Sequence, residues 1–396
     1  MGLKFSRNTE PLNFPVADRS LSKVINQRAI LHSIYKHDGI SRAQLAKELG
    51  ISKPTVTGNV EDLMQIGIVK EQGEGSAAKN GGRKPVMLYI DEKYRYVGAL
   101  DLSFLEPVCA ISDLKNNVIG LKKIKLKKNA NAETRRQSVK EAFLSLMEEN
   151  HISLEQLGSI VISRPGIIHD ETGVYYTESR HHAWTEIQLD TFLQEELQTK
   201  VSIKNDVNLA AIGEQYHGFK EEIHDMIYVR CGMGLGASII LNGSLYSGVR
   251  SAAGEIGAMR LENGQRLEDF VSIDGLTKRV EAALPHDVCD GEEMDFSAVV
   301  DLFEKGNPVI HDIVREIGRY LGLFLYNCCI LLDVDTVVFG GDYLVFDDVL
   351  FNAIENEMKD RANFKPTVMK SQINQIAGIF GCFVFGIEKI INSLVG

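Results

Sequence analysis

The sequence predicts an α/β protein whose body consists of two similar lobes, preceded by an all-α, winged helix-turn-helix domain. Three observations lead to this fold class. The chain has 396 residues, too many for one typical core. Its first 90 residues contain three short helical patterns followed by two strand patterns. Beyond them, one order of strands and helices occurs twice. We therefore expect domains at residues 1–90, 91–220 and 221–396.

Charge is distributed unevenly between these regions. Residues 1–90 carry 13 Lys and Arg against 8 Asp and Glu, a net charge of +5, which leaves 30 against 46, a net charge of −16, for the remainder. A basic front end on an acidic body indicates that the front end meets a polyanion such as DNA. Chance variation in surface charge is the alternative.

The six cysteines show no C-x-x-C spacing, so we expect buried free thiols in a reducing compartment. The first twenty residues contain no apolar signal-peptide region. Two apolar runs, Tyr320–Leu332 and Ile376–Ile387, are expected to be core helices too short to cross a bilayer. These observations predict a cytoplasmic protein.

The front end predicts a helix-turn-helix. A helical stripe covers Leu21–Tyr35, and Ser41 with Gln44 has capping-box spacing at the start of a second helix that ends at Gly50. Ser52 is a good N-cap for a third helix. We expect Pro54 in the first turn of this third helix and Val56, Val60, Leu63 and Ile66 on its buried face.

This third helix would enter the major groove by its N-terminal residues. Ile68–Lys70 and Pro85–Ile90 are predicted to form the wing, with a basic, glycine-rich tip at Lys79–Lys84. The predicted DNA-binding residues, at the start or exposed side of the helix and in the wing, are Ser52, Lys53, Thr55, Thr57, Asn59, Arg83 and Lys84. The alternative is a small helical domain with a solvated hairpin.

The body predicts two lobes of the same plan, which would leave a ligand cleft between them. In each, three closely spaced strands precede helices and a buried strand. The first lobe has strands at Tyr96–Leu102, Pro107–Ile111 and Val118–Leu126, a helix at Glu133–Glu149 and a strand at Ser159–Ser163. The second has strands at Met226–Arg230, Gly236–Leu241, Ser244–Val249 and Thr336–Phe339.

Glycines concentrate in the second lobe. Gly232, Gly234 and Gly236 follow the apolar run Met226–Val229, and a second cluster, Gly254–Gly257, contains Glu255. Glycine at this density allows backbone amides to turn toward a ligand. The alternatives are a hairpin with a glycine-rich corner and one wall of a small-molecule cleft.

Taken together, several motifs resemble the ROK family of sugar repressors, open reading frames and sugar kinases, in its repressor branch. The resemblance covers about residues 20–394 and depends on the order and spacing of the pieces. They are S-R-A-Q-L-A-K-E-L-G-I-S-K-P-T-V (Ser41–Val56), G-G-R-K-P (Gly81–Pro85), Pro165–Gly166, N-D-V-N-L-A-A-I-G-E (Asn205–Glu214), G-M-G-L-G-A (Gly232–Ala237), A-G-E-I-G (Ala253–Gly257) and V-V-F-G-G (Val337–Gly341). The resemblance implies a winged helix joined to a two-lobed, actin-like (ribonuclease H-like, sugar-kinase type) body.

The resemblance also implies a sugar site. In the family, the residues matching Asn205, Asp206 and Glu255 contact sugar, and the aspartate is the general base of the kinases. Acidic and amide groups suit a polyol, because every buried hydroxyl needs a partner. The predicted ligand residues are Asn205, Asp206, Glu255, Gly166, His181 and Glu268. Asp206 as the N-cap of a helix at Val207–Tyr216 is an alternative that is compatible with ligand binding.

Three departures from the family pattern bear on function. The phosphate loop Asp-x-Gly-x-Thr of active kinases is replaced by Asp101-Leu102-Ser103-Phe104-Leu105, so ATP binding by the usual mode is not expected. Ala258 replaces a zinc-ligating histidine, and no cysteine occurs in Glu262–Glu268, so neither zinc nor another cofactor is expected. Ser179–Trp184 lacks the family's sugar-binding asparagine; its His pair, or Arg164 and Arg180, could bind a different ligand.

The sequence thus predicts a sugar-responsive repressor without kinase activity. It would bind a palindromic operator as a homodimer or tetramer, with a sugar or sugar derivative as effector and without a membrane. Two alternatives are an ATP-dependent sugar kinase that carries a DNA-binding domain, with Asp206 as catalytic base, and a repressor controlled by a partner protein.

Overall fold

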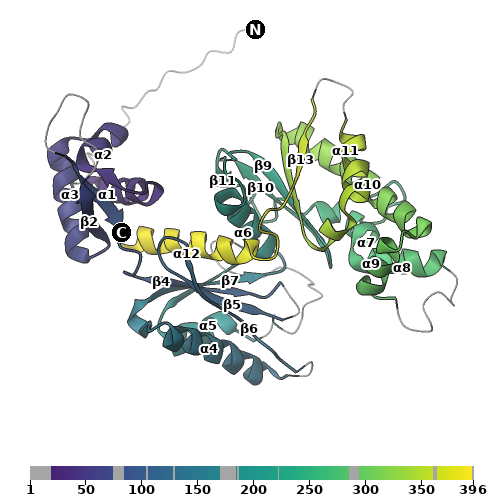
Figure 1. Cartoon of the computed structure of the whole chain (residues 1–396), viewed down its shortest axis with the longest axis horizontal. Coiled ribbons are helices and arrows are strands. Elements are labelled where there is room, and N and C mark those ends of the chain that lie inside the picture. Colours follow the sequence, from purple (N-terminus) through teal and green to yellow (C-terminus); the bar gives the residue numbers. More distant parts are fainter. Residues whose placement is uncertain are drawn as a thin grey trace, which may run out of the picture. The chain divides into compact units, whose positions relative to one another are not determined.

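The computed structural model divides the chain into two compact units. It describes residues 19–74, 84–103, 106–127, 130–169, 184, 187–221, 223–284, 294–359 and 364–394. Unit 1 consists of Met1–Tyr96, Asp113–Asn117 and Ile387–Gly396, and unit 2 consists of Val97–Ser112 and Val118–Gly386. Figure 1 shows the chain coloured along its sequence. The division into a DNA-binding domain and two lobes at residues 90 and 220 stays a prediction.

Unit 1 contains a winged helix-turn-helix. It consists of three helices and a small antiparallel sheet with the strand order β1-β3-β2. The elements are α1 (Arg19–Lys36), β1 (Ile40–Ser41), α2 (Arg42–Leu49), α3 (Lys53–Ile66), β2 (Val69–Glu74) and β3 (Val86–Ile90). The predicted helices and both wing strands are confirmed, whereas β1 is not among the predicted elements.

The helix boundaries follow the predicted caps. Ser41 and Gln44 form a capping box at the start of α2, and the Ser52 side chain accepts a hydrogen bond from the N–H of Thr55 at the start of α3. Gly50 ends α2 in the left-handed conformation with φ of 66°. These contacts satisfy backbone groups that helix ends leave unpaired.

The buried face of α3 is nearly as predicted. Val56, Val60 and Leu63 are fully buried, but the prediction for Ile66 is wrong, because its side chain is 42% exposed. Ile66 lies in the last turn of α3, immediately before the left-handed Gly67. The chain turns away there, and the helix side that Ile66 occupies is left uncovered.

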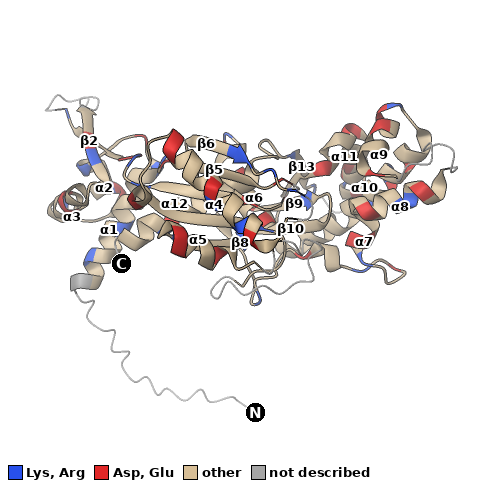
Figure 2. Ribbon diagram, turned by 90° about the horizontal axis from the view of Figure 1, so that it is seen from below, with Lys and Arg blue, Asp and Glu red and all other residues tan. Residues whose placement is uncertain are grey.

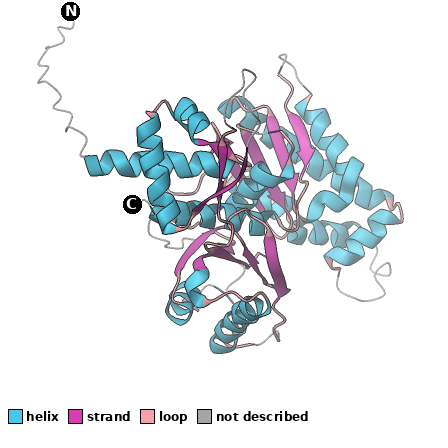
Figure 3. Ribbon diagram, turned by 60° about the vertical axis from the view of Figure 1, so that its left-hand side comes forward, coloured by secondary structure: helices cyan, strands magenta, loops and turns pink. Residues whose placement is uncertain are grey.

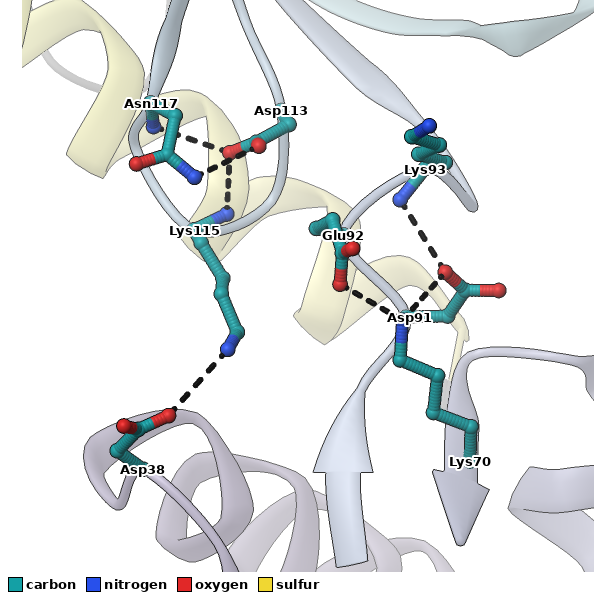
Figure 4. Close-up of polar contacts among 8 residues, drawn as sticks. All are labelled: Asp38, Lys70, Asp91, Glu92, Lys93, Asp113, Lys115 and Asn117. Carbon is teal, nitrogen blue, oxygen red and sulfur yellow. Dashed lines mark hydrogen bonds and ion pairs between the residues drawn. The ribbon is translucent and has the colours of Figure 1, made fainter. Parts of the chain in front are cut away.

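Charged side chains connect the segments of unit 1 (Figure 4). The Lys115 ammonium pairs with Asp38 at 3.4 Å, and the Lys70 ammonium pairs with Glu92 at 2.8 Å. The Asp113 carboxylate accepts a hydrogen bond from the backbone N–H of Lys115 at 2.8 Å, which holds the turn Asp113–Asn117. An open pocket of ≈ 490 Å³ lies here, lined by Asp38, Lys70, Gln72, Gly73, Tyr89, Glu92 and Lys115.

Unit 2 contains two five-stranded sheets of the same topology. The first has the order β6-β5-β4-β7-β8 and the second β11-β10-β9-β12-β13. In each sheet the first three strands in sequence form an antiparallel meander, and the last two are parallel neighbours. The predicted repeat of element order is therefore confirmed.

The first sheet is covered by helices on both faces. Figure 1 shows α4 and α5 along one face. Phe143 of α4 lies against Gly98, and Gly386 of the last helix lies against Val97, the neighbouring residue on the opposite face. The elements are β4 (Tyr96–Asp101), β5 (Val108–Ser112), β6 (Val118–Lys123), α4 (Ala132–Glu149), β7 (Leu157–Arg164), α5 (Leu189–Leu197) and β8 (Lys200–Asn205).

The second sheet packs against an extensive apolar core, to which the long helix α10 and the adjacent α11 contribute. Figure 3 shows the strands in magenta and the helices in cyan. One strand prediction is wrong in length: β11 has only two residues, and Val249, predicted to be inside it, is 99% exposed.

The remaining elements are α6 (Asp206–Gly213), β9 (Met226–Cys231), β10 (Leu235–Leu241), β11 (Ser244–Leu245), α7 (Leu267–Val271), α8 (Ile273–Ala283), α9 (Phe296–Glu304), α10 (Pro308–Leu332), β12 (Thr336–Gly340), α11 (Asp347–Met358), β13 (Thr367–Lys370) and α12 (Ala377–Leu394).

Helix α12 is longer than the apolar run that predicted it. Its 18 residues suffice, by length and composition alone, to cross a membrane, so the expectation that this run is too short is wrong. Within the protein, 61% of that stretch is buried, as in a core helix. The cysteines within the described ranges are all free thiols, while Cys289 lies outside those ranges.

Candidate functional site

The first candidate site is the N-terminal end of α3. Ser52 and Lys53 are exposed, as predicted for residues that meet DNA. Thr55 and Thr57 are half-buried, and both hydroxyls have partners within the helix: Thr55 with the Ser52 hydroxyl at 2.7 Å, and Thr57 donating to the carbonyl of Lys53 at 3.0 Å. The helix therefore presents its cap and first turn to solvent.

Asn59 does not lie on the exposed side of α3, and its predicted placement is wrong. Only 7% of the residue is exposed, and its side-chain N–H donates to the carbonyl of Thr55 at 2.7 Å. Position 59 adjoins the buried Val60 and lies one turn after the buried Val56, which places it beside the core stripe.

The wing supplies a second group of predicted residues. Lys84 is exposed just before β3. Arg83 lies outside the described residues, as does most of the tip. Strand β2 carries one basic residue, Lys70. Figure 2 shows the Lys and Arg positions in blue. The positive charge of Lys70 is paired with Asp91 and Glu92. Of the cations that the sequence predicts here, Lys53 and Lys84 have exposed side chains.

The predicted ligand residues Asn205 and Gly166 are brought together in unit 2. The Asn205 side chain accepts a hydrogen bond from the N–H of Asn208 and donates one to the carbonyl of Gly166, both at 2.9 Å. Asn205 is therefore the N-cap of α6, and the alternative that assigned this cap to Asp206 is wrong. Asp206 is the first residue of the helix.

Asp206 lies at the junction between the two sheets. Its carboxylate forms an ion pair of 3.1 Å with the guanidinium of Arg230, the residue of β9 that pairs with Gly340 of β12. Burial raises the pKa of Asp206, Arg230 acts to lower it, and the Asp101 carboxylate adds to the rise. A carboxyl group with a raised pKa at a strand end is typical of a functional site.

Glu255 lies close to Glu268 and to Asp206. Water reaches Glu255, although protein surrounds much of it. This partial burial raises the pKa of Glu255, and the charges of Glu268 and Asp206 raise it further. Glu268 pairs with Arg266 at 2.8 Å. Three of the predicted ligand residues therefore share one electrostatic environment.

The glycine-rich stretch approaches carboxylates closely. A Cβ at Gly232 would lie 2.1 Å from a carboxylate oxygen of Asp342, and a Cβ at Gly234 would lie 2.8 Å from one of Glu268. A larger residue at either position would displace the end of an acidic side chain, so glycine here leaves the carboxylates in place beside the loop. Carboxylates beside the loop disfavour an anionic phosphate there, because like charges repel.

Asp101, at the end of β4, is nearly completely buried. One of its oxygens accepts hydrogen bonds from the hydroxyl and the backbone N–H of Ser103, at 2.6 and 2.9 Å. The bulky Phe104 and Leu105, which motivated the prediction of no ATP binding, lie outside the described residues. His181 also lies outside them.

Two charged residues of this site, Arg230 and Asp342, are not among those that the sequence predicts. Arg230 comes directly after the apolar run Met226–Val229, and Asp342 directly after Gly340–Gly341. A charge at the carboxyl end of a buried strand is the signal that could have identified both, because ligands of α/β sheets bind at those ends.

Family models match both parts of the chain. The model of the ROK family matches residues 99–388, and a model of winged helix-turn-helix DNA-binding domains matches residues 25–70.

Two curated relatives are repressors. The xylose repressor of Bacillus spizizenii is 27% identical over 357 residues, which cover 87% of this chain and 89% of that protein. The N-acetylglucosamine repressor of Escherichia coli is 23% identical over 406 residues, which cover 96% of both.

Solved structures show the same fold. A ROK family transcriptional regulator, a homolog of the E. coli MLC protein, has a TM-score of 0.76 at 20% identity and covers 94% of this chain and 98% of its own. The ROK hexokinase of Thermus thermophilus has a TM-score of 0.59 at 20% identity and covers 73% of this chain and 97% of its own. The predicted fold class, a winged helix-turn-helix with an actin-like body of the sugar-kinase type, is confirmed.

Proposed function

This chain belongs to the ROK family, and we propose that it is a sugar-responsive transcriptional repressor without kinase activity. The carrying observation is that a winged helix with an exposed, capped recognition helix is joined in one chain to a ROK body. Relatives named as xylose and N-acetylglucosamine repressors support this proposal. Because DNA is its target, we place the protein in the cytoplasm.

On DNA, the start of α3 enters the major groove. Ser52 and Lys53 are exposed there, and Thr55 and Thr57 offer hydroxyls one turn further. The residues proposed to contact the phosphate backbone from the wing are Arg83 and Lys84. A two-fold symmetric dimer, or a tetramer of such dimers, fits a palindromic operator because each half-site receives one recognition helix.

The effector binds at the strand ends in unit 2. Asn205, Asp206 and Glu255 accept or donate hydrogen bonds to hydroxyls, and Gly166, Glu268 and His181 complete the proposed set. Each buried hydroxyl of a sugar needs a partner, and this set offers carboxylate and amide groups in proximity. The effector acts through its different affinity for the DNA-binding and released states.

The contacts of Asp206 favour binding over phosphoryl transfer. A general base must be free to accept a proton from the substrate hydroxyl. Here the Asp206 carboxylate is paired with Arg230, and Asp342 and Glu268 lie beside the glycine loop. The ion pair with Arg230 occupies the carboxylate that would act as general base, and the carboxylates beside the glycine loop repel a phosphate. Both features oppose ATP-dependent phosphoryl transfer.

Gel shift and footprinting with the purified chain test the proposal. We expect a protected palindrome upstream of its own gene or of neighbouring sugar genes, and altered affinity with D-xylose, N-acetylglucosamine or another member of a sugar panel. Absence of any protected palindrome overturns the proposal. Protection that no sugar or sugar phosphate changes, without thermal stabilisation by any of them, favours control by a partner protein.

Asp206 supports a second candidate function, that of an ATP-dependent sugar kinase with a DNA-binding domain. The raised pKa of this carboxyl group is the observation that favours it, because a general base needs sufficient proton affinity. An ADP-release assay over the same sugar panel decides between them. If the native chain turns over a sugar and Asp206→Asn abolishes this turnover, the protein is a kinase and the repressor-only assignment is wrong.

A further inference from the structure

Arg230 is the central positive charge among strand ends that carry carboxylates. Asp101 ends β4, Asp206 follows β8, and Asp342 follows β12. Arg230 lies in β9 opposite Gly340, two residues before Asp342. The carboxyl ends of strands from both sheets therefore converge on this one guanidinium.

The contacts around Arg230 are close. Its guanidinium lies 3.1 Å from an Asp206 oxygen, and the Asp342 carboxylate lies beside Gly232, two residues along from Arg230. Burial by itself would lower the pKa of Arg230, but the charges of Asp206, Asp101 and Asp342 outweigh burial and raise it. The guanidinium is thus held in its charged form by three acidic groups.

Without a cation, the negative charge of Asp206 would be buried beside that of Asp101 with nothing to compensate it. Asp206 and Asp101 are only 7% and 2% exposed. An isolated buried carboxylate is strongly unfavourable and takes up a proton instead. Glu255 adds negative charge near Asp206, and Glu255 in turn lies near Glu268 and Arg266, which pair with one another.

We propose that Arg230 is the resident counter-ion of this site, a cation built into the chain where one from solution would otherwise be needed. It keeps Asp206 ionised as a hydrogen-bond acceptor, so that the site takes hydroxyl groups of an uncharged ligand without a metal ion. Within the described ranges, no three acidic, histidine or cysteine side chains are arranged to hold a metal as they stand. Arg230 is thus a positioning residue that sets the ligand class, an inference that deepens the proposed function.

Cation rescue of Arg230→Ala tests this role. The variant leaves a cavity and uncompensated negative charge, both accessible to small cations. We expect its unfolding midpoint to fall by several degrees, and to recover by about 3 °C or more in millimolar methylguanidinium, Mg²⁺ or Ca²⁺, compared with NaCl of equal ionic strength. The native chain should show no such specific rise.

Arg279→Ala is the matched control. The Arg279 side chain is 22% exposed, against 24% for Arg230, and it too pairs with one carboxylate, that of Glu316. Arg230 differs in that the charges of Asp101 and Asp342 also act on it. We expect no cation-specific recovery in this control. Arg230→Lys retains the positive charge, so its unfolding midpoint should not rise specifically when one of these cations is added.

The outcomes are decisive for the counter-ion role. Recovery of Arg230→Ala by any one of the three cations, absent in Arg279→Ala, supports it. No recovery by any of them, equal recovery in the control, or failure of both Arg230 variants to fold with the cations present overturns it. The measurement contains neither DNA nor sugar, so its failure is distinguishable from failure of the repressor proposal.

Discussion

The buried carboxylate of Glu214 accepts a hydrogen bond from the backbone N–H of Ile373 at 3.1 Å. It also accepts one from the N–H of Gln372 at 3.2 Å and one from the hydroxyl of Ser371. Glu214 opens the π-helical turn Glu214–Gly218 that follows α6. One side chain therefore attaches the end of the site helix to the segment that leads into α12.

Glu214→Gln should destabilise unit 2 by about 1–3 kcal/mol, because the new amide N–H₂ would face backbone donors in place of an acceptor. Thermal or urea unfolding measures the change. Glu357→Gln is the control: Glu357 pairs with the exposed Arg319 at 3.0 Å, and its loss should cost less than about 1 kcal/mol. Equal effects of both substitutions would contradict the anchoring role of Glu214.

Gly381 of α12 should not tolerate alanine. A Cβ there would lie 1.8 Å from the carbonyl oxygen of Leu209 in α6. Because backbone has to move to relieve that clash, Gly381→Ala should cost about 3 kcal/mol or more. Gly58→Ala is the contrasting helical substitution. Nothing lies within 4 Å of the added methyl group, so stability should rise by about 0.5–1 kcal/mol. Calorimetry of both variants checks this pair.

Ser52 and Lys53 should affect DNA binding in different ways. Ser52→Ala removes the cap of α3 and should lower stability by about 1 kcal/mol as well as weaken binding. Lys53→Ala should leave the unfolding midpoint unchanged and reduce the salt dependence of binding by about one counter-ion. Affinity measured across a salt series separates them. An unchanged slope for Lys53→Ala would show that Lys53 contacts no phosphate.

Glu255→Gln should raise stability at neutral pH. The pKa of Glu255 is raised in the folded protein, so folding favours the protonated form. That favourable contribution is fully present only below the ordinary value of 4.5 and is lost as the pH rises through the higher folded value. The amide removes the charge that opposes folding. Its unfolding midpoint should therefore exceed that of the native chain at pH 7–8, and the difference should vanish near pH 4. A constant difference across this range would contradict the expectation.

Local patterns explain how far the sequence alone predicts this molecule. Ser41, Gly50 and Ser52 act within one turn of their own position, so the helix boundaries of unit 1 are readable in advance. Strands β8 and β13 were not predicted, because each is a short edge strand without a continuous apolar run. The polarity of Asn59 predicts an exposed side chain. In the structure its side-chain hydrogen bond to the carbonyl of Thr55 compensates for burial, and the sequence does not reveal this bond.

By itself the sequence determined the fold class, the family and most element types, because capping, periodicity and motif spacing depend on neighbours along the chain. It also named Asn205, Asp206 and Glu255 as site residues, while their roles stay proposals. Only the tertiary structure decided that Asn205 caps α6 and that Arg230 faces Asp206. Arg230 lies in a strand of the second sheet, whereas Asp206 begins the helix that follows the last strand of the first sheet. A buried charge acquires such a partner only when distant segments are brought together by folding.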